Sequence, residues 1–347
     1  MATVESNLRR LGTSRSRRLL SGSRIALVVL IGWFLLARWA GISLSMGTQA
    51  AVYLFGMVAL NLPYGGYEHM VNLDPRELSF GLRYIAAYLA LVVGFVAVFF
   101  VAPVVGLALA IAVAVAKGGH GGLRVLDATV GTSHLKTTAQ RALAAFVRGG
   151  TVMIVPLFFW PGDFAAFSTF MVDMFEMGAF ASVAPHFDAL RYGLGAVFAV
   201  AAVAHVAVGY LRHETLSTWA TDAGETALLI AYFAVVPVVV AVGLYFPLWY
   251  SARQSARIAA VESDPPDSGP DSSRTAPGTA VAAFVGGAIA TFALAGLLFV
   301  LLPNPMAGGT LLISGVAFFT VFISIIALPH VVVGSWFDTD RGIWYVP

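Results

Sequence analysis

Successive apolar blocks, each long enough to cross about 30 Å of hydrocarbon as an α-helix, constrain the fold of this chain most. A helix satisfies its own backbone hydrogen bonds where lipid offers none. Hydrophobic residues make up 59% of the 347 residues and charged residues only 11%, whereas a soluble domain averages about 25% charged residues. The sequence therefore predicts an all-α polytopic integral membrane protein.

The blocks predict a bundle of about eight transmembrane helices and one broken or re-entrant helical region. The apolar region 225–254 is divided by Pro237 into arms of about 12 and 17 residues, and a 12-residue helix rises only about 18 Å. A single span there would place Arg253 and Arg257 outside the cell, so we expect a hairpin with both ends cytoplasmic. The expected spans lie near residues 25–42, 48–66, 83–101, 104–120, 143–160, 192–211, 280–302 and 310–334.

Charge distribution predicts the orientation of the bundle. Arginines cluster between Arg9 and Arg24, and the expected loop 117–148 is also basic, whereas the expected loop 161–189 carries acidic residues. Basic segments favour the cytoplasmic side, so we expect a plasma-membrane protein with a cytoplasmic N-terminus and an outward-facing 161–189 loop. We read residues 1–24 as a basic cytoplasmic tail and not as a nucleic-acid patch. Residues 25–347 form a single membrane domain in this interpretation, interrupted by a disordered Pro/Ser/Asp-rich linker at 262–279.

Polar residues gather near the expected cytoplasmic helix ends. The chain has no cysteine, so a metal would have to use His, Glu, Asp or Tyr. Glu68 and His69 fit either a site or a solvated helix exit, and His330 fits either a ligand or a kink residue. His120 lies among four glycines, which give it little to pack against and favour a site. The remaining histidines fit interfacial or structural roles: His134, His186, His205 and His213.

Four motifs follow one another in a recognisable order, namely LPYGGYEH at 62–69, HGGLRVLD at 120–127, RHETL at 212–216 with WYSARQ at 249–254, and LPHVVVGSWFD at 328–338. Together they resemble the Brp/Blh family of membrane proteins. Members of that family are β-carotene 15,15′-dioxygenases, which cleave β-carotene centrally to retinal. The resemblance implies a carotenoid substrate, Fe(II) as cofactor, and retinal delivery to a rhodopsin-type partner, with the lipid bilayer around the bundle.

The resemblance also implies an iron site of four histidines, and this sequence departs from it. Only His120 matches; Tyr64, Tyr250 and Gln254 stand at the other positions. A phenolate favours ferric iron, and an amide oxygen is a weak iron ligand. An alternative cluster of Glu68, His69, His120 and His330 would give two or three histidines with a carboxylate, the ligand pattern of non-haem Fe(II) oxygenases.

Two functions therefore remain open from the sequence. The chain is either a retinal-forming dioxygenase or a divergent, non-catalytic relative that binds carotenoid or retinal during rhodopsin biogenesis. The tyrosines and the glutamine favour the second, since each can replace an imidazole in a hydrogen-bonded cluster. A transporter would predict charged pairs within the membrane and an internal repeat, and the sequence suggests neither.

Overall fold

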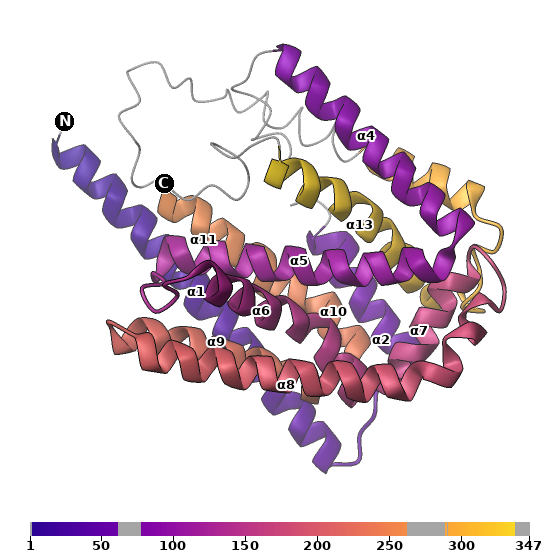
Figure 1. Cartoon of the computed structure of the whole chain (residues 1–347), viewed down its shortest axis with the longest axis horizontal. Helices are drawn as coiled ribbons and strands as arrows, with labels where there is room; N and C mark the ends of the chain where they lie inside the picture. Colours follow the sequence, from indigo (N-terminus) through magenta and orange to yellow (C-terminus); the bar gives the residue numbers. More distant parts are fainter. Residues whose placement is uncertain (1, 62–77, 262–288, 290, 337–347) are drawn as a thin grey trace.

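The computed structural model describes residues 2–61, 78–261, 289 and 291–336, which are built from helices and the turns between them (Figure 1). The larger helices pack as one bundle in which α6 contacts α5, α8 and α9. In chain order the elements are α1 (Ala2–Trp39), α2 (Met46–Leu54), η1 (Phe55–Asn61), α4 (Leu78–Val101), α5 (Pro103–Thr129), α6 (Thr138–Phe159), α7 (Pro161–Asp173), η2 (Ala179–Ser182), η3 (Ala184–His186), α8 (Phe187–Arg212), α9 (Leu216–Val235), α10 (Val238–Tyr245), η4 (Phe246–Ser251), α11 (Ala252–Val261) and α13 (Leu311–Trp336).

The predicted all-α membrane architecture is confirmed. The helices long enough to span a membrane are fewer than the eight spans predicted. Within the described residues, five helices are long and apolar enough to cross a membrane: Ser14–Trp39, Pro103–Thr129, Thr138–Phe159, Ala179–Arg212 and Leu311–Pro329. Three further predicted spans correspond to shorter apolar helices: Met46–Leu60, Ile85–Val101 and Thr291–Leu301. The expected linker 262–279 lies outside the described residues.

Helix α1 is longer than the predicted span 25–42, because it takes in the basic segment before Ile25. Ser16, Leu20 and Ser23 are buried on this segment. The Arg24 guanidinium lies 2.7 Å from the Glu225 carboxylate on α9. The end of the expected tail is therefore packed into the bundle.

The expected basic loop 117–148 is wrong: α5 continues to Thr129, and α6 begins at Thr138. The glycines of KGGHGG remain helical because they let α5 approach α6 closely. A Cβ on Gly119 would lie 2.0 Å from the Ala145 carbonyl oxygen, and one on Gly149 would lie 1.8 Å from the Val115 carbonyl oxygen. Tertiary packing thus overrides the low helix propensity of glycine.

The expected loop 161–189 is also wrong in part, because residues Pro161–Asp173 form helix α7. Pro161 occupies the first helical turn, where its missing N–H costs no hydrogen bond. The chain then continues through the short helices η2 and η3 into α8. Helix α7 packs against α5, α6 and α13, and it contributes side chains to the interior of the bundle.

The predicted break at Pro237 is confirmed, and the first arm of the hairpin is longer than expected. Helix α9 ends at Val235 and Pro237 caps α10. The 20 residues of α9 rise about 30 Å rather than about 18 Å. Arg253 donates to Glu225 over 2.8 Å, and Tyr232 donates to the Ala241 carbonyl over 3.0 Å. These contacts fold the two arms back along each other.

Candidate functional site

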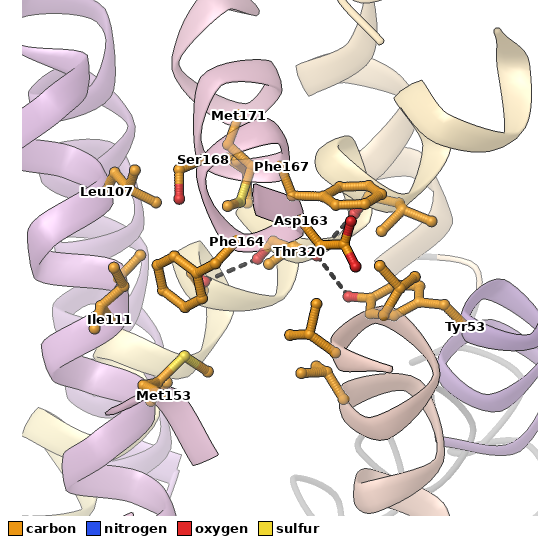
Figure 2. Close-up of a pocket in the computed structure, with 18 of the residues that line it drawn as sticks. Tyr53, Leu107, Ile111, Met153, Asp163, Phe164, Phe167, Ser168, Met171 and Thr320 are labelled. Carbon is orange, nitrogen blue, oxygen red and sulfur yellow. Dashed lines mark hydrogen bonds between the residues drawn. The ribbon is translucent and has the colours of Figure 1, made fainter. Parts of the chain in front are cut away.

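A narrow apolar cavity of about 100 Å³ lies between α5, α7, α10 and α13 (Figure 2). Figure 2 shows Leu107, Ile111, Met153 and Phe164 arranged around it. The polar side chains among its lining residues are Tyr53, Asp163, Ser168, Thr320 and Ser324.

A second apolar cavity, of about 60 Å³, continues from the first. Along α5 the lining residues advance from Leu107 in the first cavity to Lys117 in the second, a rise of about 15 Å. The lining residues of α13 advance in the same way, from Val316 to Ala327. The two cavities share Tyr53, Ala110, Ala114, Met153, Val242, Thr320 and Ser324. Together they form an elongated apolar passage, which suits an elongated apolar molecule.

The passage reaches Tyr250, one of the residues that the family resemblance singled out. Tyr250 and Lys117 both line its second cavity, and the Lys117 amine lies 5.8 Å from the centre of the Tyr250 ring. A Cβ on Gly121 would lie 2.9 Å from Gln254 Nε2 and 3.1 Å from the Tyr250 hydroxyl, so only glycine fits there without a shift. Gln254 donates to the Gly121 carbonyl over 3.3 Å. Tyr250 and Gln254 thus both lie against Gly121, with Tyr250 in the π-helical segment η4, and their role as a ligand pair stays a prediction.

His120 is exposed on α5, although its neighbour Gly121 contacts Tyr250 and Gln254. The other predicted ligands Tyr64, Glu68 and His69 lie outside the described residues. His330 lies within helix α13, and its side chain is outside what the structure describes.

The described donors do not fit the four-imidazole iron site that the resemblance implies. They supply one exposed imidazole, one phenol, and one amide whose nitrogen already donates to a carbonyl. In the described part of the chain, no group of three or more His, Asp or Glu side chains is arranged to hold a metal ion. Both iron-site arrangements from the sequence remain predictions.

A buried charged cluster, which the sequence did not suggest, lies where α1, α6, α9 and α11 meet. We define it as Arg24, Arg148, Asp222, Glu225 and Arg253, with His134 and His205 beside Asp222. Arg148 Nη2 lies 2.5 Å from Asp222 Oδ1 and 3.3 Å from Glu225 Oε2. The Nε2 atoms of His134 and His205 lie 2.8 and 3.3 Å from Asp222 Oδ2.

Every carboxylate oxygen of this charged cluster faces a cation or an imidazole. Glu225 Oε1 accepts from Arg24, and Glu225 Oε2 accepts from Arg253, whose guanidinium also stacks 4.4 Å from the centre of the Trp249 ring. The structural role expected for His134 and His205 agrees with this burial. The expectation that the bundle holds no charged pairs is wrong, because the partners come from four distant segments. In the sequence, the i, i+3 spacing of Asp222 and Glu225 was the feature that could have indicated this charged cluster, because it places both carboxyl groups on one face of α9.

The fold and the passage define a class of protein: a helical membrane protein with an elongated, largely apolar internal cavity. The family model described as beta-carotene 15,15′-dioxygenase matches residues 55–338, which is most of the chain. The chain therefore belongs to the β-carotene 15,15′-dioxygenase family of Brp and Blh proteins.

Two relatives from Halobacterium salinarum match almost the whole chain. Probable beta-carotene 15,15′-dioxygenase Brp is 50% identical over 340 residues, covering 94% of each chain. Probable beta-carotene 15,15′-dioxygenase Blh is 33% identical over 355 residues, covering 95% of this chain and 96% of the relative. No solved structure matches this chain.

Proposed function

We propose that this protein cleaves β-carotene at its central 15,15′ double bond to form retinal. In the overall reaction that C=C bond is broken and O₂ supplies the oxygen atoms of the two aldehydes. The observation that carries the proposal is the apolar passage, which connects α7 with Tyr250, the family-matched position on η4. Membership of the family supports the same substrate class.

The passage accounts for substrate binding and orientation. Its walls are aliphatic and aromatic, so a long polyene would exchange lipid contacts for equally apolar ones. The narrow part of the passage between α5 and α13 would hold the polyene in an extended conformation. The central double bond of the polyene would then have a fixed position relative to the protein. Fixing the reacting bond in one geometry is itself a large part of catalysis.

Iron, when bound by a member of this family, supplies the activation of O₂. We derive no step through iron here because the described donors do not form its site. The location proposed for the protein is the plasma membrane with a cytoplasmic N-terminus, which the arginines before Ile25 support. A rhodopsin-type protein is the proposed recipient of retinal.

A second function, binding of carotenoid or retinal without cleavage, is favoured by one observation. Tyr250 and Gln254 form part of a packed, hydrogen-bonded contact with the backbone of Gly121. A contact of this kind stabilises the helices without any metal. The passage would then store or hand over the pigment.

Retinal formation separates the two functions. The chain is expressed in a host that accumulates β-carotene, and retinal and residual carotene are measured by chromatography, with His120→Ala and an empty vector alongside. Retinal in the wild type alone supports cleavage and a role for His120. Retinal in both wild type and His120→Ala supports cleavage without that residue. Carotenoid that co-purifies with the inserted protein, with no retinal, supports the binding function.

Restoring the family ligands gives an independent test. The triple variant Tyr64→His, Tyr250→His and Gln254→His should raise both iron content and retinal formation if these positions surround the reacting bond. Unchanged iron content with the protein correctly inserted would contradict this assignment of the positions.

A further inference from the structure

The α7 end of the passage carries polar side chains that the proposed reaction does not use. Asp163 and Ser168, both on α7, line the first cavity. Figure 2 shows the Ser168 hydroxyl beside Leu107 and the Asp163 carboxyl apart from it, on the side of Phe167 and Tyr53. Within the described part of the chain, no hydrogen bond or ion pair joins either side chain to another residue. Ser168 is only 2% exposed.

The hydroxyls across the cavity are, in contrast, largely satisfied by the protein. Thr320 Oγ1 donates to the Val316 carbonyl over 2.7 Å, so its oxygen accepts from the Tyr53 hydroxyl at 2.6 Å. Ser324 donates to the Thr320 carbonyl over 2.8 Å. The oxygen of Tyr53 retains lone pairs that can accept a further hydrogen bond. The polar groups of the cavity that lack a hydrogen-bond partner in the protein are therefore mainly the side chains of Asp163 and Ser168.

Asp163 is only half-buried, and a carboxyl group that loses part of its water at the wall of an apolar cavity gains from a partner that completes its hydrogen bonds. Burial raises the pKa of the Asp163 carboxyl above its ordinary value, because the charged form loses solvation. Helix α7 packs against α5, α6 and α13, which fixes where this group lies. The position is thus built into the fold rather than left at a frayed helix end.

We propose that the α7 end of the passage is a subsite for an oxygenated end group, in which a ring hydroxyl of a polyene donates to the Asp163 carboxylate. This inference rests on the proposed function, since it assumes that a polyene occupies the passage. It extends that function, because the ligand class becomes ring-hydroxylated carotenoids as well as the unsubstituted hydrocarbon.

The chemistry of the end group follows from what Asp163 and Ser168 can offer. A carboxylate only accepts hydrogen bonds, so its partner must donate. An ammonium group would also donate, but it would bring a second charge into a space lined almost entirely by carbon. A neutral hydroxyl donates without that charge, and its oxygen can accept from Ser168 or from a water molecule. A site that hydrogen-bonds a hydroxyl discriminates against the analogue that lacks it.

The test compares two ligands that differ only in their end groups, β-carotene and its 3,3′-dihydroxy derivative. Each is titrated into the full-length protein in lipid nanodiscs, and binding is followed by the visible absorption of the polyene and by quenching of tryptophan fluorescence. The wild type should bind the dihydroxy compound about tenfold more tightly, as one hydrogen bond to a carboxylate implies. Asp163→Ala should reduce this ratio to about one, with unchanged affinity for β-carotene.

Three further variants make the result specific. Asp163→Asn keeps the size and an acceptor, so it should retain part of the preference. Ser168→Ala should lower the preference less than Asp163→Ala does. Asp188→Asn removes a carboxylate from a side chain that is 79% exposed at the start of α8, and it should leave both affinities unchanged. Thermal unfolding of each variant shows whether the bundle is intact.

Each outcome bears on a separate conclusion. A wild type that binds β-carotene without preferring the dihydroxy compound overturns the subsite and leaves the proposed function standing. An equal preference in wild type and Asp163→Ala also overturns the assignment to Asp163. Binding of neither polyene would overturn both the subsite and the function, whereas retinal formation measured separately tests the function alone.

Discussion

The charged cluster and the apolar passage lie in one bundle, and their carboxyl groups are paired in opposite ways. In the charged cluster, the four carboxylate oxygens of Asp222 and Glu225 each face a positively charged or imidazole partner. In the passage, Asp163 and Ser168 face empty space lined by carbon. Internal pairing is typical of structural polar groups, and unmet pairing in a cavity is typical of ligand sites.

The largest expected effect comes from breaking the charged cluster. Asp222→Ala would leave Arg148, His134 and His205 without their shared acceptor, and removing one partner of a buried pair costs about 3–5 kcal/mol. Unfolding in detergent measures this loss. Glu214→Ala is the matched control, because Glu214 pairs with Lys136 while 64% exposed and should change stability by less than about 1 kcal/mol. Similar losses in both variants would contradict a structural role for the cluster.

The contact between α5 and α6 is shared by the two regions, because both helices line the passage and α6 carries Arg148 of the charged cluster, so tightening it should disturb both. Gly149→Ala would place a methyl group against the Val115 carbonyl, which cannot move without shifting α5. Such overpacking costs about 1–3 kcal/mol, measured by the same unfolding assay. Gly94→Ala on α4 is the control, because no atom lies within 4 Å of the added Cβ. A loss in Gly94→Ala that equals the loss in Gly149→Ala would show that close approach is not the cause.

Filling the passage should affect ligand binding while leaving stability nearly intact. Ala114→Phe would occupy space that both cavities share, and we expect a loss of about tenfold or more in bound carotenoid, equivalent to about 1.4 kcal/mol. Co-purifying pigment and retinal formation are the measurements. Ala199→Phe on the exposed face of α8 adds the same side chain outside the passage and should change neither. Undiminished pigment in Ala114→Phe would show that the polyene binds elsewhere.

The smallest expected effect comes from removing a hydroxyl that the protein already satisfies. Tyr53→Phe deletes one hydrogen bond to Thr320, which keeps its own bond to Val316. The expected loss is about 0.5–1.5 kcal/mol in the free energy of unfolding, with little change in polyene binding. Tyr210→Phe, at a side chain that is 52% exposed, should cost less. A large loss of polyene binding in Tyr53→Phe would mean that Tyr53 belongs to the ligand site.

Part of the site could be predicted from the sequence because its members are close in the chain. Tyr250 and Gln254 are four residues apart, and both lie against Gly121 in the structure, whereas their action as a ligand pair stays a prediction. The position of Asp163 at the cavity was not predicted, because the acidic residues between 161 and 189 indicated an exposed loop. Hydropathy is averaged over a segment, so it cannot indicate that a single carboxyl group on α7 lines an internal cavity.

The sequence by itself determined the helical membrane class, the break at Pro237 and the family, because apolar length, proline geometry and motif order are all local properties of the chain. Tertiary structure alone decided that Arg24, Arg148, Glu225 and Arg253 meet, and that α5, α7, α10 and α13 leave a passage between them. These features depend on which helix faces pack together. Contacts between residues as far apart in the sequence as Arg24 and Glu225 produce no periodic sequence pattern from which they could be predicted.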